Sequence, residues 1–295
     1  MAFVSGDERL IEAYAQGKDI YATIGNLVYG VPYEDCLEFK NGEENPAGKK
    51  RRDSVKSIVL GIMYGRGAQA IADQIESTKK EAQAIIDKFF EMFPKVKAWV
   101  DKVIASAKEI GFVETVWGRK RRLPDIQLPL YEFSFIKTKD ADGKDVTAQE
   151  GEVPDHVADY YWTKLEKAWG KDKKKIKSEA YKKGIKVRDN GGKISEAERQ
   201  AVNSIIQGTS ADITKRAMLA IGRSKELREL SYRMLITVHD EVIGECPREN
   251  ALKARAIIRD LMLKAADKIN IPMKVDFEIN LMWYGPKISD EELAA

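Results

Sequence analysis

The stretch YRMLITVHDEVIGEC, residues 232–246, carries the most information about this chain. Two apolar runs flank the polar tripeptide His239-Asp240-Glu241, a pattern that predicts two antiparallel strands joined by a tight turn. A hairpin tip can present carboxylates rigidly to solvent, and two adjacent carboxylates suit a hard, oxygen-ligated cation such as Mg²⁺. A surface hairpin with a polar tip explains the same residues, so the function of the tip depends on the rest of the chain.

The segment RRDSVKSIVLGIMYG, residues 51–65, predicts a helix with one unusual face. Four side chains recur at every fourth position and therefore stay close to one side: Arg52, Lys56, Leu60 and Tyr64. The two cations can bind the oxygens of a triphosphate, and the aromatic ring can stack on a base. An amphipathic helix with a solvated basic edge is the alternative. Gly61 argues against it, because a glycine that weakens a helix suggests a close approach to the backbone.

A third segment, residues 198–217, predicts a helix with a polar face and an apolar face. The polar face carries Arg199, Asn203 and Gln207, spaced by four residues. Arginine, asparagine and glutamine are side chains that hydrogen-bond to nucleic-acid backbones and base edges. Ordinary helix surface remains the other interpretation of this segment.

Composition limits the class of protein. The chain has 295 residues, 43% of them apolar, which is enough for one large or two modest domains. No run approaches the roughly 20 apolar residues of a membrane span, and the N-terminus does not resemble a secretory signal, so we expect a cytoplasmic protein without a membrane partner. The net charge is only +3, but basic residues cluster at 49–52, 119–122 and 173–175. Such clusters can neutralise phosphates or simply remain solvated.

Hydrophobic periodicity predicts an α+β fold, in which a helical region is followed by helices packed on a small antiparallel sheet. The expected helices span 7–28, 51–64, 78–92, 94–110, 155–183, 195–206, 210–228 and 249–269. The expected strands are a short hairpin at 111–118 and runs at 232–238, 241–246 and 273–280, and 37–48 is expected to be a loop.

Each motif alone is ambiguous, but their order is informative. The chain contains R-x3-K-x7-YG from Arg52, then R-x3-N-x3-QGT from Arg199, then an apolar strand ending in VHDE. This combination resembles the DNA polymerase I family (family A DNA polymerases) from about Ser5 to about Leu281, with one long interruption. The stretch GFVETVWGRKRRLPD looks like the connection between the fingers and the palm of that family.

The resemblance implies a partial right-hand polymerase fold in three parts. Residues 1–126 would form the fingers with a preceding edge of the palm, and 194–295 would form the distal palm. Residues 127–193 would be an insertion, which makes the chain look phage-like. This segment holds aromatic side chains and many lysines, so it is either an added contact with DNA or a partner, or a helical excursion without such a role.

The resemblance also implies a reaction, the addition of deoxynucleotides to a primer 3′ end on a DNA template with two Mg²⁺ ions. It assigns Asp240 as a metal ligand, Glu241 as its nearby support and His239 as a contact to the primer terminus. It assigns the primer–template contacts to Arg199, Asn203 and Gln207. The expected partners are primer–template DNA and deoxynucleoside triphosphates, in replication or in repair.

In the fingers, the resemblance assigns the incoming triphosphate to Arg52 and Lys56, and Lys56 is also the candidate general acid for pyrophosphate. Tyr64 would hold the geometry of the nascent base pair. Leu60 stands where many members of the family carry a phenylalanine or tyrosine that lies against the incoming sugar. Because leucine lacks the flat ring and the hydroxyl group, we expect weak acceptance of dideoxynucleotides.

One departure from the family affects activity directly. The chain contains no segment of the type DYSQIELR, which in the family supplies the second metal-binding aspartate, and it lacks the thumb and any exonuclease domain. One carboxylate hairpin does not hold two Mg²⁺ ions, so we expect the isolated chain to be inactive or nearly so. A partner polypeptide that carries the thumb and the missing motif would complete it. The alternatives are a remnant that binds DNA or nucleotide without catalysis, and a chain shortened by truncation or by a misplaced start codon.

Overall fold

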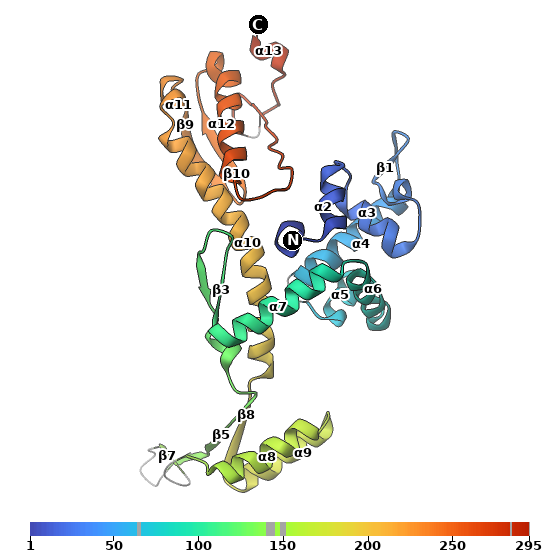
Figure 1. The fold of residues 1–295 in the computed structure, drawn as a ribbon, viewed down its shortest axis with the longest axis vertical. Coiled ribbons are helices and arrows are strands. Elements are labelled where there is room, and N and C mark those ends of the chain that lie inside the picture. The colour runs from blue at the N-terminus through green and yellow to red at the C-terminus, as the bar shows by residue number, and fades with distance from the viewer. Residues whose placement is uncertain (64–65, 140–144, 148–151, 284, 295) are drawn as a thin grey trace. The chain divides into compact units, whose positions relative to one another are not determined.

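A computed structural model of the chain describes residues 1–63, 66–139, 145–147, 152–283 and 285–294. The fold is α+β as expected, with a majority of helices and several small antiparallel sheets of two strands each (Figure 1). The chain separates into two compact units, Met1–Arg122 with Arg199–Ala295, and Leu123–Glu198. Among the described residues, no helix combines the length and the apolar character that crossing a membrane requires.

The first part of the larger unit is helical. Its helices are α1 (Ala2–Ser5), α2 (Glu8–Ala15), α3 (Ile20–Tyr29), α4 (Pro46–Met63), α5 (Ala68–Gln74), α6 (Lys79–Met92) and α7 (Pro94–Ile110). The sequence predicted α6 and α7 to within one residue. Thr78 and Glu81 form a reciprocal capping box at the start of α6, and Pro94 opens α7, where its missing N–H costs no hydrogen bond.

Three details of this helical part differ from expectation. The helix expected over 7–28 is divided into α2 and α3, because Gly17 has a φ of 64° and Asp19 caps a new helix. The side chain of Asp19 accepts hydrogen bonds from the backbone N–H groups of Tyr21 and Ala22. The expected loop at 37–48 contains a small hairpin, β1 (Phe39–Lys40) and β2 (Glu43–Glu44), and α4 already begins at Pro46. Helix α5 was not expected at all.

A closed apolar core holds these helices together. The most completely buried large side chains in it come from α3, α4, α6, the start of α7 and the residue between α6 and α7: Ile24, Val55, Phe89, Phe93 and Val96. A second cluster joins α4 to α5 through Ile58, Ile71 and Ala72. Two faces of α4 are therefore covered by other helices of the same unit.

The C-terminal part of the larger unit is built around one long helix, whose first residues, 191–198, belong to the smaller unit. Helix α10 (Gly191–Arg223) replaces the two helices expected at 195–206 and 210–228, and it begins four residues before the expected capping residue Ser195. The helix continues through Gly208 because a hairpin docks there. A Cβ on Gly208 would lie 2.7 Å from Thr115 Cγ2, and Thr209 Oγ1 accepts a hydrogen bond from the N–H of Val116 at 3.2 Å.

The larger unit also contains two hairpins and further helices. They are the hairpin β3 (Phe112–Glu114) and β4 (Lys120–Arg122), α11 (Lys225–Glu229), the hairpin β9 (Arg233–Val238) and β10 (Glu241–Glu245), α12 (Ala251–Ala265) and α13 (Asp290–Ala294). The hairpin predicted at 232–246 is thus confirmed. The hairpin predicted at 111–118 extends further than expected, because its second strand is Lys120–Arg122. Their sheets contain two strands each.

The strand expected at 273–280 is not formed. Its side chains still alternate, with Val275, Phe277 and Ile279 half-buried between exposed neighbours, and Phe277 packs against the cluster around α12. Among the described residues, the only ladder contact of this segment is a single bridge from Asn280 to Lys287. The alternation therefore reports which side faces the core, while a strand also needs a hydrogen-bonded neighbour.

The smaller unit, Leu123–Glu198, has its own core. Its elements are β5 (Tyr131–Phe135), β6 (Lys137–Lys139), β7 (Asp145–Thr147), α8 (Asp155–Lys167), α9 (Lys171–Lys182) and β8 (Ile185–Asp189). Strand β5 pairs with β8 in antiparallel register, and Tyr161 and Ile185 lie at the centre of the apolar cluster. The single helix expected over 155–183 is broken at Gly170, which has a φ of 51°. The predicted division at 127–193 stays a prediction.

Candidate nucleotide-binding and catalytic residues

Helix α4 separates an apolar side from a basic one. Val55 and Ile58 are buried in the cores described above, whereas Arg52 is half-buried and Lys56 is exposed. Leu60 lies one turn further along and is half-buried. The predicted alignment of Arg52, Lys56 and Leu60 along one helix is therefore present. Tyr64 and the following glycine lie outside the described residues.

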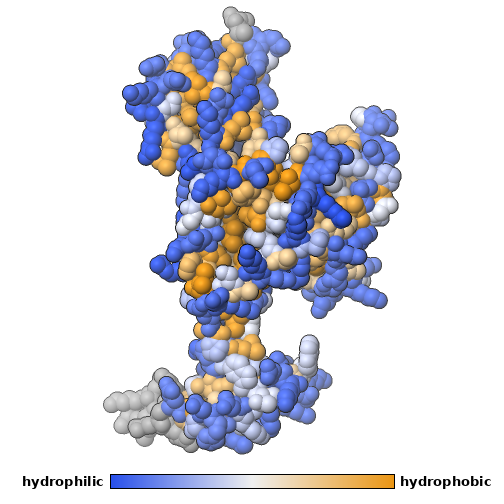
Figure 2. Space-filling model, in the orientation of Figure 1, coloured by the Kyte–Doolittle hydropathy of each residue, from blue (hydrophilic) through white to orange (hydrophobic). Residues whose placement is uncertain are grey.

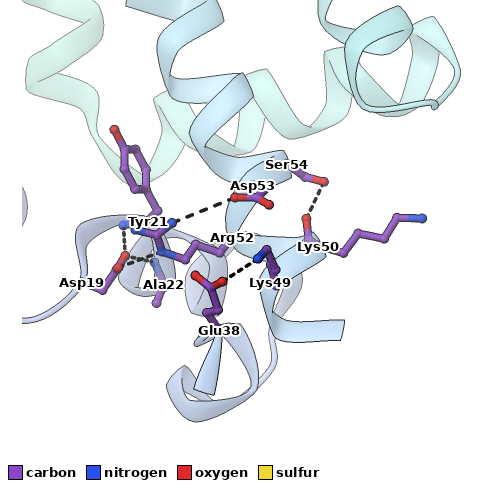
Figure 3. A network of polar contacts seen from close by, with 9 residues as sticks. All are labelled: Asp19, Tyr21, Ala22, Glu38, Lys49, Lys50, Arg52, Asp53 and Ser54. Atoms are coloured by element: carbon purple, nitrogen blue, oxygen red, sulfur yellow. Dashed lines mark hydrogen bonds and ion pairs between the residues drawn. The ribbon is translucent and has the colours of Figure 1, made fainter. Parts of the chain in front are cut away.

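Arg52 is held by groups from α3, as Figure 3 shows. Its Nε donates to Asp19 Oδ2 at 2.8 Å, and its guanidinium lies 5.5 Å from the centre of the Tyr21 ring. The other carboxylate oxygen of Asp19 caps α3, so the residue that starts α3 also fixes the arginine. The hydrogen bond to Asp19 raises the pKa of Arg52. The Asp19 contact joins residues 33 positions apart, and sequence periodicity does not show it.

Other polar groups on α4 are satisfied locally. Lys49 pairs with Glu38 at 2.6 Å, and Ser54 donates to the carbonyl of Lys50 at 2.8 Å (Figure 3). Lys56 differs, because it has no ion-pair or hydrogen-bond partner in the part of the chain that the structure describes. Its amine is therefore available to an anionic ligand.

A cavity of about 380 Å³ lies beside α4, but on a different side from these residues. It is lined by Pro46, Lys49, Lys50, Asp53, Ser54, Ser57, Gln74, Ile75 and Glu76. None of Arg52, Lys56 and Leu60 contributes to it. We therefore do not assign this cavity to nucleotide binding.

Gly61 has a structural explanation. A Cβ at this position would lie 2.8 Å from Cγ1 and 2.9 Å from Cδ1 of Ile71. The close approach expected from the sequence is thus made by α5 and gives no evidence of a ligand.

The polar face of α10 is partly ordered by its own contacts. Asn203 Nδ2 donates to Gln207 Oε1 at 3.2 Å, as their spacing of four residues predicts. Asn203 Oδ1 is buried without a hydrogen-bond partner among the described groups. Arg199 lies two turns of helix from Gln207 and is half-buried.

A residue from a predicted basic cluster anchors the β3–β4 hairpin to α10. Arg119 Nε pairs with Asp212 at 2.7 Å, and its Nη2 donates to the carbonyl of Gly208 at 2.9 Å. Farther along, the Arg216 guanidinium lies 5.0 Å from the centre of the Trp117 ring. Arg119 belongs to a basic cluster that could neutralise phosphates or remain solvated, and in the structure it joins two elements of the protein.

The tip of the β9–β10 hairpin presents its polar residues to solvent. His239 and Asp240 form a two-residue turn between Val238 and Glu241, and all four residues are exposed. His239 has a φ of 55°, a conformation that few residues other than glycine adopt, although histidine is among the tolerated ones. Thr237 Oγ1 donates to the carbonyl of Glu241 at 2.9 Å and closes the turn.

The hairpin tip does not by itself form a metal centre. Among the described residues, no group of three or more histidine, cysteine, aspartate and glutamate side chains could hold a metal ion. Asp240 and Glu241 supply two carboxylates, which is fewer than a Mg²⁺ ion bound only by protein would need.

Comparison with known proteins gives the family of this chain. The family model for DNA polymerase family A matches residues 1–138 and 155–285. This chain belongs to DNA polymerase family A.

Individual relatives are more distant. The thermostable DNA polymerase I of Thermus aquaticus is 28% identical over 287 residues, which cover 97% of this chain and 26% of that protein. DNA polymerase I of Chloroflexus aurantiacus is 26% identical over 283 residues, which cover 96% of this chain and 22% of that protein. The chain thus spans about a quarter of the length of these curated relatives.

A solved structure confirms the fold. The POL domain of Pol1 from M. smegmatis, solved in complex with DNA primer-template and dNTP, superposes with a TM-score of 0.64 at 22% identity. The match covers 92% of this chain and 35% of that one. The described fold is therefore consistent with part of a polymerase domain.

Proposed function

We propose that this chain forms the nucleotide-binding part and one carboxylate of the active site of a DNA-directed DNA polymerase. Membership of family A supports this proposal, and the observation that carries it is the basic side of α4. There, Lys56 is exposed and unpaired among the described residues, one turn from an arginine whose position is fixed by Asp19. A helix that served only to cover the core would have no need to hold a cation in place at this position.

In the proposed reaction, Arg52 and Lys56 bind the triphosphate of the incoming deoxynucleotide. Arginine offers a planar fork of donors and lysine a mobile point charge, so the two are suited to different phosphate oxygens. Lys56 also delivers a proton to the leaving pyrophosphate. Leu60 lies against the sugar, and Tyr64 supports the nascent base pair.

The palm residues act on the primer. Asp240 at the hairpin tip is proposed as a ligand of Mg²⁺, with Glu241 beside it and His239 at the primer terminus. The bound ion would supply charge stabilisation for phosphoryl transfer. Arg199, Asn203 and Gln207 on α10 contact the primer–template. Among the described residues the buried Oδ1 of Asn203 has no hydrogen-bond donor, so it remains able to accept a hydrogen bond.

We further propose that a partner polypeptide completes the site. Strand β9 exposes three large apolar side chains, Leu235, Ile236 and Val238, and among the described residues it pairs with β10 alone. Neighbouring apolar side chains of this kind, on a strand with an open edge, favour coverage by a further strand. A strand that also carried an aspartate would supply a further carboxylate beside Asp240 and Glu241.

Primer extension tests the proposal. We expect no extension by the purified chain, and Mg²⁺-dependent extension when a family A polypeptide carrying the thumb and a DYSQIELR-type segment is added. Lys56→Ala should then reduce the rate by about a hundredfold, because general acid–base catalysis contributes roughly 10²–10⁴-fold. Lys50→Ala removes the same charge from another side of α4 and serves as the matched control.

Two outcomes would contradict the proposal. Robust extension by the chain alone would exclude the need for a partner. Equal rates for Lys56→Ala and Lys50→Ala in the completed enzyme would show that Lys56 takes no specific part in the reaction.

A further inference from the structure

The outer side of α9, in the smaller unit, is strongly basic. The helix contains six lysines against one aspartate and one glutamate. Ile176 and Ala180 face the apolar core of the unit, which places another set of side chains on the opposite side. This set, hereafter the α9 basic face, consists of Lys171, Lys174, Lys175, Tyr181 and Lys182, all exposed.

Two of the carboxylates near α9 are already paired with other lysines, and the exposed Asp172 in its first turn is the one acidic side chain of the helix that forms no ion pair with a described residue. Glu179 lies 3.6 Å from Lys164 and 3.7 Å from Lys183, and Asp189 pairs with Lys177 at 2.8 Å. In contrast, the four lysines of the α9 basic face form no ion pair with any described residue. Their charge is not neutralised within the unit, so the face attracts a polyanion.

Exposed aromatic rings adjoin these lysines. Trp169, two residues before α9, is 87% exposed, and Tyr181 is 61% exposed. The carbonyl of Trp169 accepts a hydrogen bond from the N–H of Asp172, which fixes the backbone that carries the indole. The aromatic residues at 161 and 162 differ, because Tyr161 is buried in the core and Trp162 packs edge-on against Tyr131.

The composition of this face selects among partners. It contains no leucine, isoleucine or valine, and the surface over α8 and α9 shows little orange in Figure 2. A membrane-binding helix needs an apolar side, and the cores of protein–protein interfaces are depleted in lysine. Lysines beside flat, exposed rings are instead the combination that binds single-stranded nucleic acid, since the rings stack on unpaired bases.

We propose that the α9 basic face binds single-stranded DNA. The face extends over roughly 16 Å from Lys171 to Lys182, at about 1.5 Å per residue, so it contacts a few nucleotides. Lysines contact the phosphates and Trp169 stacks on a base. This site contains none of the residues proposed for nucleotide addition, and DNA is chosen as the nucleic acid because the chain belongs to a DNA polymerase family.

Anisotropy of a labelled oligothymidine of about twelve nucleotides tests the proposal with the full chain and no dNTP. At roughly 50 mM salt, Lys174→Glu with Lys175→Glu should weaken binding by about tenfold and lower the salt slope by about 1.4. Lys174→Gln with Lys175→Gln should give a smaller loss in the same direction. Trp169→Ala should weaken binding by about fivefold or more, whereas Trp169→Phe, which keeps a stacking ring, should retain most of it.

The pair Lys79→Glu with Lys80→Glu is the matched control, because these neighbouring lysines are exposed on α6 and the change in charge is the same. An equal loss in this control, an unchanged affinity for Trp169→Ala, or equally tight binding of duplex DNA would overturn the proposal. Lys56→Ala, assayed by primer extension in the completed enzyme, tests the proposed polymerase function without involving the α9 basic face. This variant distinguishes failure of the α9 proposal from failure of the proposed polymerase function.

Discussion

Helix α4 and strand β9 both carry proposed active-site residues next to apolar ones, but only α4 has its apolar side covered. Val55 and Ile58 of α4 are 1% and 2% exposed, whereas Leu235 of β9 is 57% exposed. In Figure 2, orange surface is visible in the region of β9, β10 and α12. The chain therefore positions its proposed triphosphate-binding residues by itself, while β9 retains an apolar surface and an open edge that another segment can cover.

The same contrast holds for the polar groups. Arg52 on α4 is fixed by an ion pair and an aromatic ring from another helix, whereas Asp240 lies exposed at a turn that is held by one side-chain hydrogen bond. Preorganised charge is the main source of catalytic stabilisation in sites of this kind. If the proposed function holds, we expect nucleotide binding to depend on this chain alone and metal binding to depend on the proposed partner polypeptide as well.

The largest expected effect concerns Asp240. In the completed enzyme, Asp240→Ala should lower the rate of extension by about a thousandfold, since a bound metal ion supplies several kcal/mol of charge stabilisation. The melting temperature of the chain should not change, because the side chain is exposed. Glu245→Gln, at the other end of the same hairpin, is the control. A loss of less than tenfold for Asp240→Ala would remove this carboxylate from the site.

Shortening one apolar side chain on α4 and one on β9 tests whether only α4 has its apolar side covered. Ile58→Ala should destabilise the isolated chain by about 3 kcal/mol, because the side chain is buried between α4 and α5. Leu235→Ala should change the stability of the isolated chain by less than about 0.5 kcal/mol.

Chemical denaturation measures both values, and Leu235→Ala should in addition weaken binding of the completing polypeptide. Comparable destabilisation of the isolated chain by both variants would show that β9 is already covered, and the contrast would then disappear.

The sequence predicted local features better than pairings between distant segments. The helices at 78–92 and 94–110 follow from capping residues and periodicity within each helix. The segment 273–280 shows the alternation of a strand without its ladder, because alternation records burial and not the presence of a neighbour. The continuity of α10 through Gly208 depends on a hairpin about 90 residues earlier in the chain, which no local pattern reveals.

The candidate site shows the same limit. The spacing of Arg52, Lys56 and Leu60 along one helix follows directly from a period of 3.6 residues. The contact between Arg52 and Asp19 does not, because it joins two helices.

A smaller effect on stability is expected at Gly61, where α4 packs closely against Ile71 of α5. Gly61→Ala should destabilise the chain by about 1–2 kcal/mol, because the new methyl group would meet Ile71 at 2.8 Å and overpacking outweighs the better helix propensity. Gly222→Ala in α10 is the control, since a Cβ there meets nothing within 4 Å, and it should stabilise the chain by about 0.5–1 kcal/mol. Denaturation curves measure both. Addition of Ile71→Ala should reduce the cost of Gly61→Ala, and an unchanged cost would contradict the steric explanation.

The smallest expected effect concerns the ion pair between Asp19 and Arg52. Asp19→Asn keeps a good capping residue for α3 and removes a negative charge that competes with phosphate for the arginine. Both side chains are only about a quarter exposed, so the pair is partly shielded from water. Because ion pairs at such sites contribute about 1 kcal/mol or less, we expect Asp19→Asn to raise the affinity of the isolated chain for dNTP by about threefold. Asp35→Asn neutralises a carboxylate that pairs with Lys40 and should have no effect. Titration calorimetry distinguishes the two results. A decrease in affinity for Asp19→Asn would show that Asp19 orients Arg52 toward the nucleotide and does not compete with it.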